Sequence, residues 1–168
     1  QSHIGLPGVF PGSVSWGDYD NDGYLDILVA GSGYELFAKV YHNNGDNTFS
    51  EQTGISLVGA MYVCSLWGDY DNDGDLDILI GGEDEVGNII SKVYRNNGDN
   101  TFTERTEIQL YPLREVNHGS FAWGDYDNDG DLDLLVTGRM QGGQRVSKIY
   151  RNNSFVTNTP PVVPTESH

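Results

Sequence analysis

One acidic stretch occurs three times in this chain, and it constrains the fold more than any other feature of the sequence. Each copy reads Trp-Gly-Asp-Tyr-Asp-Asn-Asp-Gly-x-Leu-Asp, and the copies span residues 16–26, 67–77 and 123–133. Counted from the first aspartate, each loop has Asp at positions 1, 3, 5 and 9 and Gly at position 6. Carboxylates this close repel one another unless a cation lies between them, so the spacing predicts a metal site in every copy.

Calcium is the ion that best suits this spacing. Ca²⁺ takes about 6–8 oxygen ligands, and glycine at position 6 permits the bend that turns positions 1, 3 and 5 inward. Position 7 would offer a backbone carbonyl, which explains why its side chain varies between Tyr and Asp. The predicted ligands of three Ca²⁺ ions are Asp18, Asp20, Asp22, Tyr24 and Asp26; Asp69, Asp71, Asp73, Asp75 and Asp77; and Asp125, Asp127, Asp129, Asp131 and Asp133.

The residues after each loop exclude two other calcium motifs. An EF-hand requires a bidentate Glu at position 12 and flanking helices, but position 12 is Val29, Ile80 or Val136 within a short apolar run. A dockerin-type loop would also be followed by a helix, whereas these runs predict a buried strand. A merely solvated Asp- and Gly-rich turn is the alternative for one copy, and three near-identical copies favour metal binding.

The repeat extends beyond the loops and predicts the fold class. Its tryptophans are 51 and 56 residues apart, a period typical of propeller blades or solenoid units. Each unit contains four short stretches with strand character; in the first unit they are residues 13–16, 25–30, 39–44 and 48–51. We therefore predict an all-β protein of three four-stranded antiparallel β-propeller blades.

The expected boundaries follow from the repeat. Blade 1 is expected at residues 12–54, a linker and blade 2 at 55–107, and a linker and blade 3 at 108–158, with a shortened last strand at 154–157. Residues 1–11 match the end of a preceding inter-blade linker, and residues 159–168 read as a Pro-rich tail or linker. The repeated tryptophans and tyrosines are expected in the core between blades: Trp16, Trp67, Trp123, Tyr41, Tyr94 and Tyr150.

Composition limits the partners and the setting. The net charge is −16, and much of the acidity lies in the three loops, which argues against nucleic acid and anionic membranes as partners. The sequence shows no membrane-inserting segment. The single cysteine, Cys64, excludes an internal disulfide and is expected to be a small buried strand residue. Calcium sites would then stabilise the fold, which suits an extracellular, secreted or cell-surface protein.

The motif Asp-x-Asp-x-Asp-Gly-x-x-Asp before an apolar strand, repeated at blade spacing, resembles the FG-GAP/VCBS repeats. These repeats form the β-propellers of integrin α subunits and of many secreted bacterial proteins. The amino-acid sequence of the motif, Trp-Gly-Asp-Tyr-Asp-Asn-Asp-Gly, is similar to that of the bacterial type. The resemblance covers roughly residues 4–156. It implies that calcium binds in the hairpin loop between the first two strands of each blade.

A three-bladed chain is expected to be incomplete by itself. Propellers close with about 4–8 blades, so we expect either further blades in the same protein or a homo-oligomer that completes the ring. The function expected is a non-enzymatic calcium-stabilised module for adhesion or for recognition of a protein or carbohydrate ligand. The alternatives are a structural or assembly unit of a cell-surface protein and, with less support, the propeller part of an enzyme acting on polysaccharide.

Overall fold

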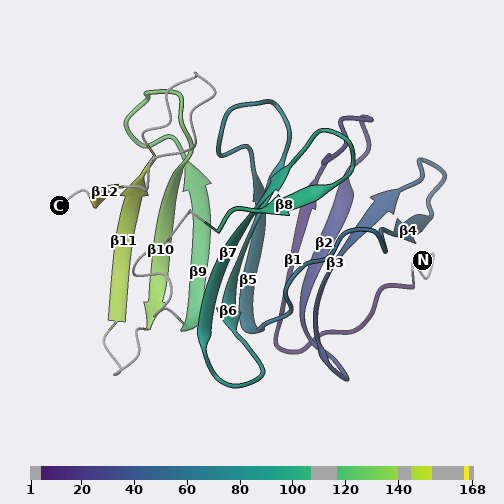
Figure 1. Cartoon of the computed structure of the whole chain (residues 1–168), viewed down its shortest axis with the longest axis horizontal. Coiled ribbons are helices and arrows are strands. Elements are labelled where there is room, and N and C mark those ends of the chain that lie inside the picture. Colours follow the sequence, from purple (N-terminus) through teal and green to yellow (C-terminus); the bar gives the residue numbers. More distant parts are fainter. Residues whose placement is uncertain (1–4, 107–116, 140–144, 153–164, 167–168) are drawn as a thin grey trace.

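The computed structural model describes residues 5–106, 117–139, 145–152 and 165–166, and every regular element among them is a β-strand (Figure 1). The first four strands are β1 (Gly12–Gly17), β2 (Asp26–Ser32), β3 (Leu36–Asn43) and β4 (Phe49–Glu51). The next four are β5 (Met61–Gly68), β6 (Asp77–Glu83), β7 (Ile89–Asn96) and β8 (Phe102–Glu104). The last four are β9 (Asn117–Gly124), β10 (Asp133–Arg139), β11 (Arg145–Arg151) and β12 (Thr165–Glu166).

The strands form three antiparallel sheets, each in chain order. The orders are β1-β2-β3-β4, β5-β6-β7-β8 and β9-β10-β11-β12. Figure 1 shows the sheets side by side, with the first at the right and the third at the left. The innermost strands of neighbouring sheets contact each other, β1 with β5 and β5 with β9. This arrangement confirms the predicted all-β class with three blade-like sheets.

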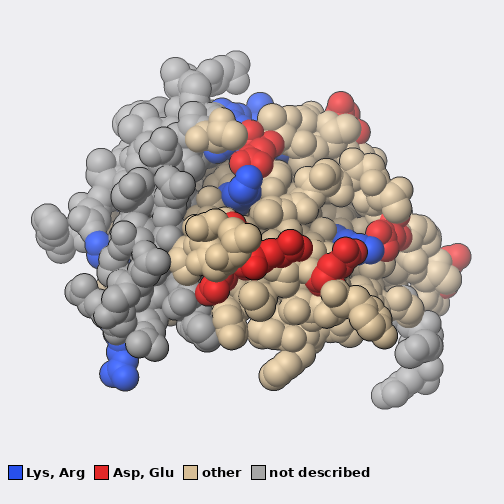
Figure 2. Space-filling model, turned by 60° about the horizontal axis from the view of Figure 1, so that its bottom comes forward, with Lys and Arg blue, Asp and Glu red and all other residues tan. Residues whose placement is uncertain are grey.

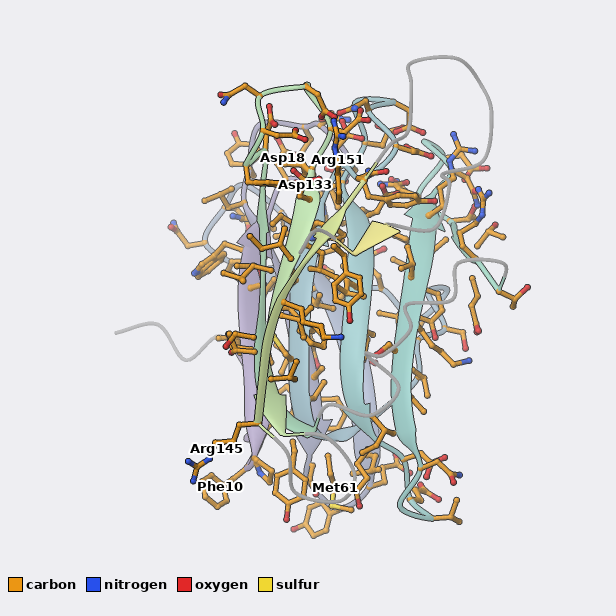
Figure 3. The ribbon with its side chains drawn as sticks, turned by 90° about the vertical axis from the view of Figure 1, so that its left-hand side faces the viewer. Phe10, Asp18, Met61, Asp133, Arg145 and Arg151 are labelled. Carbon is orange, nitrogen blue, oxygen red and sulfur yellow. The ribbon has the colours of Figure 1, made fainter. Side chains whose placement is uncertain are left out.

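Each acidic loop connects the first two strands of a sheet. The strand pairs end at Gly17↔Asp26, Gly68↔Asp77 and Gly124↔Asp133, so the residues between these pairs form the loops. Because the strands are antiparallel, all three loops lie at one end of the sheets, opposite to the β2–β3 and β6–β7 hairpins. Figure 3 shows this directly, since Asp18 and Asp133 lie at one end while Phe10 and Met61 lie at the other.

The core lies between the sheets and explains the apolar run after each loop. Residues 26–31 of β2 and 77–82 of β6 are buried without interruption because both faces of each strand are covered. Neighbouring sheets cover both faces of β6, whereas the outer face of β2 is covered by Leu6 and Val9 with two phenylalanines of the same sheet. Tyr41, Tyr94 and Tyr150 are also buried, as predicted. Trp67 is buried and Trp123 packs against the cluster between the second and third sheets. Trp16 departs from the prediction: it is 59% exposed, because within the described residues no second sheet packs on its side of β1.

The third sheet has an outer strand that the sequence did not indicate. The strand expected at residues 154–157 lies outside the described residues. Two residues of the Pro-rich tail form β12, in which Thr165 pairs with Arg151 and Glu166 pairs with Tyr150. Among the described residues, no helix is present that could cross a membrane.

Candidate metal centre

The backbone of each acidic loop makes the same two left-handed turns. Position 4 is an asparagine with φ between 57° and 59° in all three loops, and position 6 is a glycine with φ between 90° and 94°. Asparagine tolerates this left-handed region better than other residues with a side chain, and glycine enters it at no steric cost. The Asn-Asp-Gly sequence therefore sets the curvature that gathers the aspartates. The positions are Asn21, Asn72 and Asn128, with Gly23, Gly74 and Gly130.

The first aspartate of each loop holds the turn together through its carboxylate. In the first loop the backbone N–H groups of Asp22 and Gly23 donate to Asp18 Oδ1 and Oδ2 at 3.0 and 2.9 Å. The N–H of Tyr24 donates to Asp22 Oδ1 at 2.8 Å. The equivalent bonds recur in the second and third loops. Backbone N–H groups of the same loop thus fix the side chains at positions 1 and 5.

The last aspartate of each loop is a buried carboxylate. Asp77 is 2% exposed and accepts the N–H groups of Tyr70 and Asn96 at 3.1 and 2.8 Å. Burial raises the pKa of Asp77 to about 8, although these two hydrogen bonds oppose the shift. Burial likewise raises the pKa of its two counterparts, which accept the equivalent pairs of N–H groups: Asp26 and Asp133.

The middle aspartate of each loop carries an oxygen that suits a cation. The Oδ1 atoms of Asp20, Asp71 and Asp127 are buried and accept no hydrogen bond from any described residue. A buried carboxylate oxygen without a partner costs free energy, and a metal ion between the carboxylates would satisfy it. In each loop at least three ligand atoms lie within 4.8 Å of one another. The donor set, all oxygen apart from His42 in the first loop, is one that Ca²⁺ prefers.

Basic side chains from the third strand of each sheet lie beside the loops, and sequence reasoning missed them. Arg95 Nε lies 2.8 Å from Asp71 Oδ2, and its Nη2 lies 2.6 Å from Asp73 Oδ2. Arg151 reaches the equivalent oxygens of Asp127 and Asp129. Each guanidinium thus orients two predicted ligands by their outer oxygens. The repeated Tyr-Arg-Asn-Asn at the end of the third strand was the signal that could have revealed them.

The first loop has a histidine where the other two have arginine. His42 Nδ1 lies 3.2 Å from Asp20 Oδ2 and 3.4 Å from Asp26 Oδ1. An imidazole nitrogen can serve as a metal ligand, which a guanidinium cannot, and His42 is grouped with Asp20 and Asp26 as a possible ligand set. The sequence interpretation gave His42 no metal-related role, and the structure brings it to the first loop.

The comparison with protein families decides what these repeats are. The sequence model of the FG-GAP-like repeat family matches residues 18–80 and 69–136. These two matches together cover most of the chain and all three acidic loops. The chain belongs to the FG-GAP-like repeat family. This membership confirms the resemblance inferred from the Asp-x-Asp-x-Asp-Gly-x-x-Asp spacing. A comparison with curated proteins gave no significant match.

The FG-GAP-like repeats of this chain are linked to one another through their loops. Asn21 Nδ2 of the first loop donates to Asp75 Oδ1 of the second at 2.8 Å. Asn72 Nδ2 of the second loop donates to Asp131 Oδ1 of the third at 2.6 Å. In two repeats the side chain at position 7 therefore accepts a hydrogen bond from the preceding loop. The sequence interpretation had assigned a role only to the backbone carbonyl at this position. The metal-ligand role of the three carbonyls at position 7 stays a prediction.

Replacing Arg95 by glutamine should destabilise the metal-free FG-GAP-like chain by about 1 kcal/mol. The guanidinium is more than a third exposed, so solvent screens much of its attraction for Asp71 and Asp73. Urea unfolding in a chelator measures the change. Lys92→Gln is the matched control, because it removes a part-buried ion pair with Glu104 away from the loops. Equal effects of the two variants would contradict the role given to Arg95.

Proposed function

We propose that the chain is a calcium-stabilised, non-catalytic extracellular module for adhesion or recognition. Three Ca²⁺ ions bound in the acidic loops hold one end of the sheets rigid, and the opposite end presents loops to a protein or carbohydrate ligand. The observation that carries this proposal is that the acidic loops and the loops proposed to bind the ligand lie at opposite ends of the strands. Asp18, Asp133 and Arg151 lie at one end in Figure 3, and Phe10, Met61 and Arg145 lie at the other.

Metal binding rests on a repeated property of the loops. The same carboxylate oxygen is buried without a hydrogen bond in all three loops, at Asp20, Asp71 and Asp127. A single orphan oxygen could be accidental, but threefold repetition at one motif position indicates a common ligand. Calcium would supply only charge and oxygen coordination here, and it would lock the hairpins that the aspartates close.

The end opposite to the acidic loops exposes several large apolar side chains. Phe10 is 90% exposed, and Tyr34 in the β2–β3 hairpin and Val86 in the β6–β7 hairpin project fully or almost fully into solvent. The N–H of Phe10 donates to the Ser32 carbonyl at 2.9 Å, which places Phe10 beside the β2–β3 hairpin. Tyr62 at the start of β5 has φ 49°, an unusual value for a bulky residue. Exposed aromatics and strained backbone are both common at binding sites.

Charge narrows the class of ligand. The chain carries a net charge of −16, and Figure 2 shows acidic groups in a row across the middle of one face. Long-range repulsion would disfavour nucleic acid and anionic membranes. Aromatic side chains on a loop suit a sugar ring or an apolar patch on a protein, and neither requires positive charge on this chain. We therefore retain protein and carbohydrate as the two ligand classes.

Tyr34→Ala should weaken binding by roughly 30-fold if Tyr34 is an anchor of this surface, because a buried aromatic anchor contributes about 2 kcal/mol or more. The ligand would be found by screening the calcium-loaded chain against a glycan array and an array of extracellular proteins. Leu25→Ala is the control, since Leu25 is an exposed apolar residue in the first acidic loop. Equal losses in both variants, or no ligand on either array, would favour a purely structural unit.

A further inference from the structure

The contact between the first two sheets is built around a glycine and two aromatic rings. A Cβ atom added at Gly17 would lie 2.7 Å from Cδ1 of Trp67, so the indole covers this glycine at close range. The same indole stacks on Tyr19, with ring centroids 5.8 Å apart and planes 8° apart. Asn96 Nδ2 also donates to the Tyr19 carbonyl at 2.8 Å. Tyr19 is 1% exposed and Trp67 is 8% exposed as a result.

The contact between the second and third sheets repeats this design. A Cβ atom at Gly68 would collide with the indole of Trp123, and Tyr70 is 4% exposed. Asn152 Nδ2 donates to the Tyr70 carbonyl at 2.7 Å, as Asn96 does in the first contact. Each junction therefore joins a Gly-x-Tyr of one sheet to a Trp and an Asn of the next. One face of each sheet thus presents the Gly-x-Tyr groups, and the opposite face presents the Trp and Asn groups that contact them.

The outer face of the third sheet carries the same receiving groups without a cover. A Cβ atom at Gly124 would meet nothing within 4 Å. Tyr126 is 46% exposed, against 1% and 4% for Tyr19 and Tyr70. Leu135 in β10 is 43% exposed, although its counterparts in the first two sheets are fully buried. This face thus has the receiving half of a junction and lacks the inserting half.

The outer face of the first sheet carries the inserting groups. Leu6 and Val9 already cover its β2 side, as Ile55 and Leu57 pack into the first internal contact, and the β1 side stays exposed. Trp16 is 59% exposed and Val14 is 66% exposed. The Trp16 ring contacts Phe49 with centroids 6.2 Å apart, as the Trp67 ring contacts Phe102. Asn43 Nδ2 donates to the Leu25 carbonyl at 3.0 Å. Its counterpart Asn96 makes that intrasheet bond and a second one to the preceding sheet.

We propose that the two open faces pair between two copies of this chain. Trp16 of one copy covers Gly124 and stacks on Tyr126 of the other, and Asn43 donates to the Tyr126 carbonyl. The argument is continuity with the two internal junctions, since the open faces carry the two halves of the same contact. Two copies joined in this way at both ends form a six-bladed ring, within the range in which propellers close.

One feature of the internal junctions is missing from this intermolecular one. In the chain, the asparagine at loop position 4 donates to an aspartate at position 7 of the next loop, as Asn21 does to Asp75. The first loop has Tyr24 at position 7, so Asn128 of the other copy would meet no carboxylate there. The junction between copies should therefore be weaker than those within a copy, and Tyr24→Asp should restore the bond.

Sedimentation equilibrium in saturating calcium tests the proposal. The unmodified chain should form a dimer, and Gly124→Ala should weaken it by about 100-fold, because an added methyl group in a packed interface must displace its neighbour. The same methyl group meets nothing in the separate chain, so its melting temperature should not change. Gly54→Ala is the matched control, since a Cβ at Gly54 also meets nothing within 4 Å and the turn lies outside both faces. Tyr24→Asp should tighten the dimer roughly tenfold by adding a hydrogen bond at each junction.

Two results would overturn the proposal. A chain that stays monomeric at all concentrations would show that something other than a second copy covers the faces, such as further blades or another protein. A dimer that Gly124→Ala leaves unchanged would place the interface elsewhere. An assembly that grows without limit and is blocked by Gly124→Ala would refute closure into six blades.

Discussion

Removal of calcium should lower the melting temperature of the chain by about 16–32 °C. A ligand that binds only the folded state stabilises it by about 2.7 kcal/mol per site when its free concentration is about 100 times its Kd. Three such sites contribute about 8 kcal/mol, and about 1 kcal/mol moves the melting temperature by 2–4 °C in a domain of this size. The physical source is the repulsion among four carboxylates in each loop, which the ion removes.

Differential scanning calorimetry in chelator and in excess calcium measures this shift. Asp20→Ala removes the buried middle carboxylate of the first loop and should reduce the shift to about two-thirds, because two of three sites remain. Asp46→Ala is the control, since Asp46 is an exposed turn residue that holds Thr48 and belongs to none of the acidic clusters. Superimposable melting curves with and without calcium would refute the metal sites proposed for all three loops.

The sequence predicts the strands and the loops well because both depend on local patterns. The Asn-Asp-Gly turn favours left-handed backbone at Asn21 and Gly23, and the chain reverses direction there between the antiparallel strands β1 and β2. The runs after the first two loops are buried without interruption because both of their faces are covered, whereas Leu135 in the run after the third loop is 43% exposed. Family membership follows from the same spacing, so the fold class and the position of the acidic loops were both predictable.

The partners of the acidic loops were not predictable from local spacing. Arg95 follows Asp73 by 22 residues, and only the antiparallel pairing of β6 with β7 brings the guanidinium to the loop. Contacts between loops, such as Asn21 with Asp75, span 54 residues and depend on how the sheets pack. The exposure of Trp16 has the same origin, because burial of the repeated tryptophans is decided by the neighbouring sheet and not by the repeat itself.

Acidification from pH 8 to pH 5 should stabilise the metal-free chain by about 2–4 kcal/mol through Asp77. Burial raises the pKa of this carboxyl to about 8 in the folded chain, while the unfolded value is near 3.9. Between these values the folded chain binds a proton that the unfolded chain does not, so the free energy of unfolding decreases as pH rises. Burial raises the pKa of Asp26 and Asp133 in the same direction.

Bound calcium should reverse the sign of this pH dependence. The ion requires ionised carboxylates and holds Asp77 deprotonated in the folded chain, so protons compete with it and stability then falls on acidification. Urea unfolding at several pH values, in chelator and in excess calcium, measures both slopes. Asp77→Asn removes the titrating group and keeps an oxygen to accept one of the two buried N–H groups, so its metal-free slope should become shallower. If the free energy of unfolding of the metal-free, unmodified chain instead increased with pH, Asp77 would be ionised in the folded state. The loop would then tolerate this charge without an ion.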